Sequence, residues 1–171
     1  KPNQKEITMG KRQPNPIDPD VVRKFFDYED GALKWKIKKG RAAIGDVAWK
    51  SCNGYKMFTL NRKTYQEHRL IWAWHYGTVP DEIDHINGDF LDNSIENMRE
   101  ATHQQNMYNR KIPSHNKTGV KGVYMTRGKY RSQITKDGVM KYLGSFSSLG
   151  AAKATVENAR NELHMEFANN G

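Results

Sequence analysis

The fold of this chain is decided by residues 83–110, which read IDHINGDFLDNSIENMREATHQQNMYNR. Residues 83–85 end a predicted strand, and the Asn-Gly-Asp turn that follows lets the chain reverse. Residues 95–101 can return as a second strand. Thr102, followed three residues later by Gln105, is a capping-box signature that opens a short helix. The stretch therefore predicts a unit of strand, loop, strand and helix.

Asp84 and His85 are neighbours on the first predicted strand, so their side chains point to opposite sides of it. Asn106 lies one turn into the predicted helix, where it can face the strand. One side of the unit can then hold a metal ion and the other an attacking water. Histidine titrates near neutrality and can act as a general base, while Asp with an amide oxygen suits Mg²⁺, which takes few protein ligands. An isolated Asp-His pair is usually surface decoration, and only the flanking pattern with Asn97 favours catalysis.

These residues resemble the HNH nucleases with a ββα-metal site, in particular the phage and intron-encoded HNH homing endonucleases. The resemblance rests on Asp84-His85, on Asn97 within Glu-Asn-Met-Arg, and on Asn106. It implies that His85 is the general base that takes a proton from the attacking water. It also implies that Asp84 and Asn106 hold one divalent metal, Mg²⁺ with Mn²⁺ as a substitute, and that Asn97 holds the loop and so orients His85.

The composition is that of a soluble protein. The 171 residues suffice for one ordinary domain or two to three small ones, and 36% are hydrophobic against 27% charged. The longest apolar run, residues 70–74, is far too short to span a membrane, and no signal-like segment leads the sequence. We therefore expect no membrane association and a cytoplasmic location, which the resemblance places in a phage-infected or bacterial host cell.

The net charge of +9 is unevenly distributed. Residues 1–80 carry 16 Lys and Arg against 8 Asp and Glu, residues 81–112 carry 3 against 7, and residues 113–171 carry 9 against 4. Basic surface attracts the phosphate backbone, whereas an acidic pocket repels it unless a cation intervenes. An acidic island between basic flanks favours a metal-dependent nuclease, which the resemblance directs to double-stranded DNA, although charge runs are also common as solvated faces.

The sequence before this island divides into an arm and a small mixed region. Residues 1–17 show no hydrophobic period and predict a flexible basic arm. Residues 18–80 predict an α+β region that contacts DNA. Its expected elements are a helix capped by Asp18 and ending near residue 27, a strand over 33–37, a hairpin over 54–66 and a helix over 67–76 stopped by Gly77. Lys34 and Lys36 share one face of the expected strand, and they are either phosphate contacts or part of a solvated face.

The end of the chain predicts a second unit. Residues 113–117 read as a linker and residues 118–171 as a sheet with one helix. Three strand-like runs, at 120–125, 129–135 and 139–146, are separated by Arg-Gly and Asp-Gly turns, the latter a strong hairpin signal. A helix from 148 to about 167 is expected to cover one sheet face with Ala152, Val156, Ala159 and Leu163. Alternation then points Tyr130, Ser132 and Ile134 toward the helix and Lys129, Arg131 and Gln133 away from it.

This second unit resembles the APETALA or ethylene-response-factor class of DNA-binding domain. The matching residues are GVKGV at 119–123, GKY at 128–130, YLGSF at 142–146 and AA at 151–152. In that class the three-stranded sheet lies in the major groove, which implies that Lys129, Arg131, Gln133 and Tyr142 reach DNA. Arg127 and Lys141 depart from the plant pattern, so the base that each position reads cannot be transferred. An ordinary α+β interaction module is the alternative.

The sequence thus predicts a small multi-domain α+β chain, with a ββα-metal core at residues 81–112 and a C-terminal three-stranded antiparallel sheet packed on one helix. The predicted function is that of a site-specific HNH homing-type endonuclease. Because it holds a single Asp-His, Asn and Asn set, one chain is expected to nick duplex DNA as a monomer. The alternatives are a sequence-specific DNA-binding regulator with an inactive nuclease core and an RNA-binding factor that uses the same basic sheet.

Overall fold

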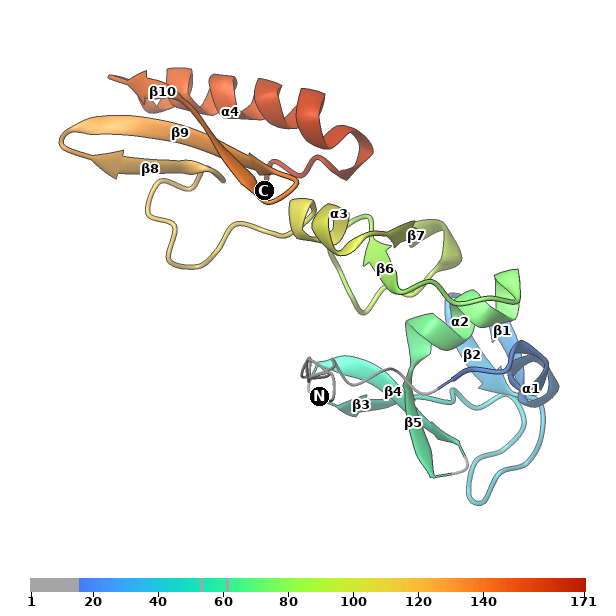
Figure 1. Cartoon of the computed structure of the whole chain (residues 1–171). Helices are drawn as coiled ribbons and strands as arrows, with labels where there is room; N and C mark the ends of the chain where they lie inside the picture. Colours follow the sequence, from blue (N-terminus) through green and yellow to red (C-terminus); the bar gives the residue numbers. More distant parts are fainter. Residues whose placement is uncertain (1–15, 53, 61) are drawn as a thin grey trace, which may run out of the picture. The chain divides into compact units, whose positions relative to one another are not determined.

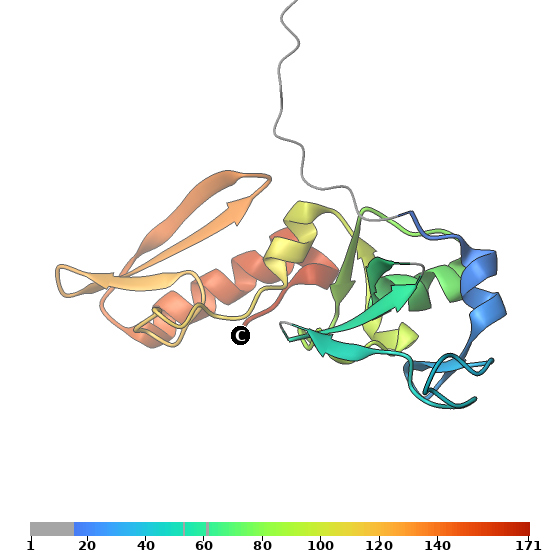
Figure 2. The ribbon, with the colours of Figure 1, turned by 90° about the horizontal axis from the view of Figure 1, so that it is seen from below.

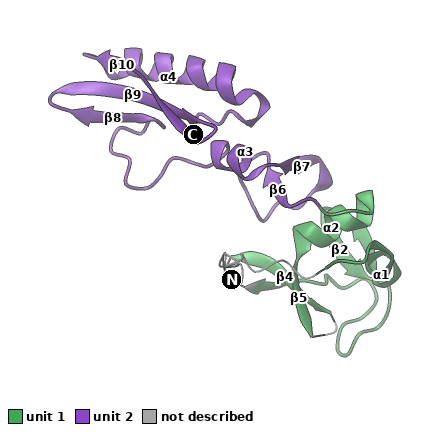
Figure 3. Cartoon of the chain, in the orientation of Figure 1, with its two compact units in different colours: residues 1–79 green, residues 80–171 purple. Residues whose placement is uncertain are grey.

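The computed structural model describes residues 16–52, 54–60 and 62–171 (Figure 1). Residues 1–15 of the predicted arm lie outside these ranges. The chain divides into two compact units, residues 1–79 and residues 80–171 (Figure 3). No helix in the described part of the chain combines the length and the apolar character that crossing a membrane requires.

In its described residues, the first unit joins two helices to two small antiparallel sheets. Asp18 caps the first helix by accepting from the backbone N–H groups of Asp20 and Val21, as predicted. This helix ends at Phe25 rather than near residue 27, because the chain passes directly into a strand that the sequence did not reveal. The elements are α1 (Pro19–Phe25), β1 (Phe26–Glu29), β2 (Ala32–Trp35), β3 (Lys50–Cys52), β4 (Tyr55–Leu60), β5 (Lys63–Gln66) and α2 (Glu67–Tyr76).

Aromatic side chains from three strands form the core of this unit. Phe26 is fully buried, with its ring centroid 4.7 Å from that of Trp35 and 4.8 Å from that of Phe58. Ile71 of α2 is also fully buried. Each such side chain contributes about 1.5 to 3 kcal/mol when it leaves water. The helix α2 ends at Gly77, whose φ of 73° lies in the left-handed region, as its position in the sequence predicts.

The predicted order of strand, loop, strand and helix is present at the start of the second unit, but residues 95–97, predicted as part of the second strand, form a 3₁₀ turn. The elements are β6 (Glu82–His85), the 3₁₀ turn η1 (Ile95–Asn97), β7 (Met98–Ala101) and α3 (His103–Tyr108). β6 and β7 pair antiparallel with Asp84 opposite Arg99. The capping box is complete, since the Thr102 hydroxyl accepts from the Gln105 N–H at 3.2 Å and Gln105 Oε1 accepts from the Thr102 N–H at 2.7 Å.

The predicted three-stranded antiparallel sheet on one helix is confirmed. Its elements are β8 (Val123–Thr126), β9 (Lys129–Lys136), β10 (Val139–Phe146), α4 (Leu149–His164) and the 3₁₀ turn η2 (Met165–Phe167), with strand order β10-β9-β8. Helix α4 runs along one side of the sheet (Figures 1 and 2). Both hairpin turns hold two consecutive residues at positive φ, 49° and 72° at Arg127 and Gly128, and 51° and 77° at Asp137 and Gly138. Such turns match the twist of the strands they join.

The apolar stripe of α4 differs from the prediction. Ala152 and Val156 are fully buried, but the stripe continues through Arg160 and His164, which are 2% and 8% exposed, while Ala159 and Leu163 are only partly buried. The four buried residues of α4 recur every fourth position, from Ala152 to His164, so they form one row along the helix. Arg160 can be buried there because its Nη2 donates to the Lys121 carbonyl at 2.6 Å and its Nη1 to Asn170 Oδ1.

Candidate active site

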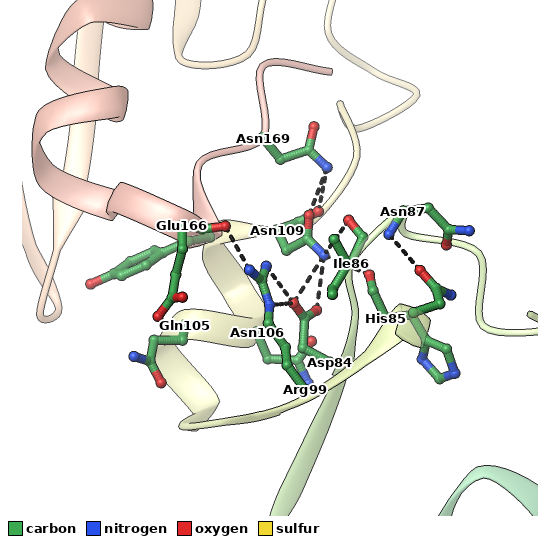
Figure 4. Close-up of polar contacts among 12 residues, drawn as sticks. Asp84, His85, Ile86, Asn87, Arg99, Gln105, Asn106, Asn109, Glu166 and Asn169 are labelled. Carbon is green, nitrogen blue, oxygen red and sulfur yellow. Dashed lines mark hydrogen bonds and ion pairs between the residues drawn. The ribbon is translucent and has the colours of Figure 1, made fainter. Parts of the chain in front are cut away.

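The Asp84 carboxylate on β6 is held from two sides (Figure 4). Asp84 is 3% exposed, and its Oδ2 accepts from Nε and Nη2 of Arg99, both at 2.8 Å. Asn109 Nδ2 approaches the same carboxylate, 2.9 Å from Oδ1 and 3.1 Å from Oδ2. Charge-assisted bonds of this kind are strong and directional, so they fix the plane of the carboxylate.

Asn109, which follows the last residue of α3, was not singled out by the sequence. It is 6% exposed, and its Nδ2 also lies 2.7 Å from the His85 carbonyl oxygen and 3.4 Å from that of Ile86. An amide nitrogen carries two protons, and here four oxygens surround it. The signal that could have found it is the Asn-x-x-Asn spacing of Asn106 and Asn109, which puts both side chains on one helix face.

Asn106, predicted as the second metal ligand, turns its amide toward Glu82. Its Nδ2 donates to Glu82 Oε2 at 2.9 Å, while Glu82 Oε1 lies 2.6 Å from His103 Nδ1. Glu82 precedes Asp84 by two residues and so shares its face of β6. Helix α3 therefore sets Asn106 beside Glu82 and Asn109 beside Asp84.

The oxygens around Asp84 suit a hard cation. In the described ranges no three His, Cys, Asp or Glu side chains are grouped as in a metal centre. What converges instead is one carboxylate with the carbonyl oxygens of His85 and Ile86, and the surplus of acceptors around Asn109 Nδ2 makes this point favourable for positive charge. Mg²⁺ is commonly held by one or two carboxylates and several waters. The residues present supply oxygen ligands of the kind that Mg²⁺ takes, but an ion would have to share Asp84 with Arg99 and displace Asn109 Nδ2.

His85 presents its imidazole away from Asp84, on the opposite side of β6 (Figure 4). His85 is 9% exposed, and its Nε2 lies 3.0 Å from Oδ1 of Asn93, which is 2% exposed. An amide oxygen can only accept, so this pairing assigns the ring proton to Nε2 and the basic lone pair to Nδ1. The sequence missed Asn93 because an Asn within Asp-Asn-Ser is typical of a turn.

Asn97 ties together the loop that carries Asn93. Its Oδ1 accepts from the Asn87 N–H at 3.0 Å, and its Nδ2 donates to the Asp92 carbonyl at 2.8 Å. Asp92 accepts in turn from the hydroxyl and backbone N–H of Ser94, bonds that lower the pKa of the Asp92 carboxyl. Asn97 thus bonds the backbone of the loop, and Asn93, within that loop, bonds the imidazole of His85.

The face of the C-terminal sheet that points away from α4 carries polar and aromatic side chains. The opposite face is fixed by Ser132, whose buried hydroxyl donates to the Ala152 carbonyl at 2.9 Å. Strand alternation turns Arg131 and Gln133 to the outer face, where the register pairs them with Tyr124 and Tyr142 on the neighbouring strands. The outer-face residues predicted from sequence are Lys129, Arg131, Gln133 and Tyr142, and Tyr124 joins them from β8.

Lys34 and Lys36, the predicted phosphate contacts, have acidic partners within their own hairpin. Lys34 Nζ pairs with Glu29 and lies 3.8 Å from Asp30, and Lys36 Nζ lies 3.3 Å from Asp27. The hydrogen bond with Glu29 raises the pKa of Lys34. A phosphate would have to compete with these carboxylates for both lysines.

Comparison with known proteins places this site in a family context. A family model for HNH endonucleases matches residues 65–108, from β5 through α3. Protein 3.8 of Escherichia phage T7 is 31% identical over 118 residues, which cover 67% of this chain and 94% of that protein. An uncharacterized HNH endonuclease of Acanthamoeba polyphaga mimivirus is 33% identical over 159 residues, 84% of this chain and 83% of that protein. No solved structure matches the chain.

Proposed function

The chain belongs to the HNH endonuclease family, and we propose that it is a metal-dependent endonuclease that hydrolyses a phosphodiester bond of double-stranded DNA. The observation that carries the proposal is that Asp84 and His85 lie on opposite faces of β6. One face of the strand presents Asp84 among oxygen ligands suited to a cation, and the other presents His85 with its ring orientation set by Asn93.

His85 acts as the general base in this proposal. Its Nδ1 lone pair takes a proton from the water that attacks the phosphorus, and the imidazole becomes an imidazolium. The bond from Nε2–H to Asn93 then becomes charge-assisted and so is stronger in the transition state than in the ground state. Asn93 therefore lowers the barrier through His85, and Asn97 does so through the loop.

Asp84 provides the carboxylate that would hold a divalent cation, Mg²⁺ with Mn²⁺ as a substitute. When bound, such an ion neutralises charge on a phosphoryl oxygen and on the leaving 3′ oxygen. Asn106 would serve as the second protein ligand through its amide oxygen, since its Nδ2 donates to Glu82. The Arg99 guanidinium orients Asp84 through two bonds to Oδ2.

The outer face of the C-terminal sheet is the proposed reader of the DNA sequence. Arg131 can pair bidentately with guanine, and Tyr142 can contact a thymine methyl or stack on a base. Lys129, at the edge of this face, adds a phosphate contact. A single nuclease site beside a separate reading surface suits a homing-type enzyme that binds an asymmetric site as a monomer and nicks one strand.

A DNA-binding regulator with an inactive nuclease core is the second candidate. The observation that favours it is the engagement of Asp84 by Arg99 and Asn109, which a metal ion must tolerate or displace. Cleavage in Mg²⁺ that EDTA abolishes would exclude this candidate, and sequence-specific binding without cleavage in Mg²⁺ or Mn²⁺ would establish it.

Digestion of a supercoiled plasmid that carries one target site tests the main proposal. His85→Ala should slow cleavage about 10²-fold or more, the usual scale for a lost general base, without weakening DNA binding. His115→Ala, a change at an exposed histidine after α3, is the matched control and should cleave normally.

The same digestion tests whether one chain nicks: open circles should accumulate before linear DNA. Linear product that forms at once, at a rate rising with the square of enzyme concentration, would replace the monomeric nickase with a dimer.

A further inference from the structure

A segment distant in the sequence, residues 165–170, follows α4 and lies against the two residues that hold Asp84 (Figure 4). Both side chains that hold Asp84, those of Arg99 and Asn109, are themselves held by this segment. The residues that follow α4 thus connect the C-terminal unit to the active site. They do so along two paths, one through Arg99 and one through Asn109.

The first path runs through Arg99. Its Nε and Nη2 bond Asp84, and its Nη1 donates to the Glu166 carbonyl at 2.6 Å. The centre of the same guanidinium lies 3.7 Å from the ring centroid of Phe167, within the range of a cation–π contact. Phe167 is 4% exposed, so the ring is itself fixed by packing. With three groups engaged, the guanidinium has one orientation, and it passes this orientation to the carboxylate of Asp84.

The second path runs through Asn109. The Nδ2 of Asn169 donates to the Asn109 side-chain oxygen at 2.9 Å and to the Asn109 carbonyl at 2.7 Å. Because a donor faces the amide oxygen of Asn109, its nitrogen turns toward the acceptor oxygens of Asp84, His85 and Ile86. Asn169 thereby determines which atom of Asn109 meets the carboxylate.

The segment is anchored on both sides of this contact. Lys121 Nζ donates to the carbonyl oxygens of Tyr108, Arg110 and Asn169, and so joins the end of α3 to the segment. One residue further along, Asn170 accepts from Arg160 of α4. Asn169 and Asn170 are therefore adjacent and similarly tethered, but only Asn169 contacts a residue that bonds Asp84.

We propose that segment 165–170 is a positioning element of the nuclease site, with Asn169 and Phe167 as positioning residues that act on Asp84 through Asn109 and Arg99. This inference rests on the proposed metal-dependent cleavage. Residues behind metal-binding carboxylates set their orientation, and losing one weakens metal affinity or activity about 10- to 100-fold. The C-terminal unit would then serve catalysis directly, in addition to any DNA that its sheet binds.

The test uses the full chain and two matched pairs of variants. Asn169→Ala is compared with Asn161→Ala, a change at an exposed asparagine of α4, and Phe167→Leu with Met165→Leu, a change at a residue that is 73% exposed in the same turn. Mn²⁺ binding is measured without DNA from the electron paramagnetic resonance signal of the free ion. Single-turnover cleavage is followed across a Mn²⁺ titration, DNA affinity is measured in EDTA, and thermal unfolding is recorded for every variant.

Asn169→Ala and Phe167→Leu should weaken Mn²⁺ binding about tenfold or more, slow cleavage at low Mn²⁺, and recover as Mn²⁺ is raised, with DNA affinity unchanged. Their controls should match the wild-type chain. A purely structural role would lower the unfolding temperature without recovery at high Mn²⁺.

Equal Mn²⁺ affinity within each pair, or tighter binding in Asn169→Ala, overturns the positioning role and leaves the proposed function standing. A wild-type chain that neither binds Mn²⁺ nor cleaves DNA removes the proposed function and this inference together.

Discussion

Replacing Asn93 by alanine should slow DNA cleavage by about 10- to 100-fold, because the change leaves the Nε2–H of His85 without its acceptor. The bond is 3.0 Å long, and the two residues are 2% and 9% exposed, so water replaces the lost partner poorly. A buried donor left unsatisfied costs about 1 to 3 kcal/mol. Each 1.36 kcal/mol on the barrier changes the rate about tenfold, and the loss falls on the transition state, where the ring is charged.

The assay is single-turnover cleavage of an end-labelled duplex, with enzyme in excess and saturating Mg²⁺. Asn87→Ala is the matched control, because Asn87 is an exposed asparagine of the same loop that bonds Asp92 and Asp89 instead of the imidazole. Asn93→Asp keeps an acceptor for Nε2–H and should retain more activity than Asn93→Ala. DNA affinity should stay constant throughout. If Asn93→Ala cleaves as fast as Asn87→Ala, the assignment of Asn93 as the support of the general base is wrong.

Three further predictions address the rest of the chain. Arg131→Ala should relax sequence preference at one base pair by about 1 to 3 kcal/mol, measured by cleavage of a selected library, and full retained preference would remove the sheet as reader. Lys36→Ala should weaken binding to all duplexes alike and reduce by about 1 the slope of the logarithm of the binding constant against the logarithm of the salt concentration. An unchanged slope would mean that Asp27 keeps this lysine from DNA. Burial lowers the pKa of His164, so the unfolded chain binds this proton more readily and the free energy of unfolding should fall as pH drops below about 6.5. Urea unfolding of His164→Phe, which keeps a ring over Tyr108, should show a flatter pH dependence, and an equal slope would contradict the assignment.

Much of the fold could be predicted because its signals are local. The Asp18 cap, the Thr102 capping box and the end of α2 at Gly77 each depend on hydrogen bonds between residues a few positions apart. The same holds for the Asp-Gly turn at residue 137, whose two positive φ angles set the hairpin register. Strand alternation likewise fixed Asp84 and His85 on opposite faces before any tertiary contact was known.

Short-range rules failed where a prediction depended on which side of a helix faces the sheet. The buried stripe of α4 was expected to run through Ala159 and Leu163. Instead Arg160 and His164 are buried, because the Lys121 carbonyl accepts from Arg160 and the Thr135 carbonyl lies 2.9 Å from His164 Nε2. A hydrophobicity pattern cannot register such acceptors. They exist only once the sheet and helix have packed.

The sequence by itself determined which residue types stand at the site: an Asp-His pair on a strand and amides on the loop and helix that follow. Only the tertiary structure decided which of them meet. Asn109 rather than Asn106 faces Asp84, Asn93 reaches His85, and Arg99 is held by Glu166, which lies 67 residues away. The reason is that strand and helix periods fix the direction of a side chain relative to its own element. The distance and rotation between two elements come from packing, which brings together residues whose separation along the chain carries no signal.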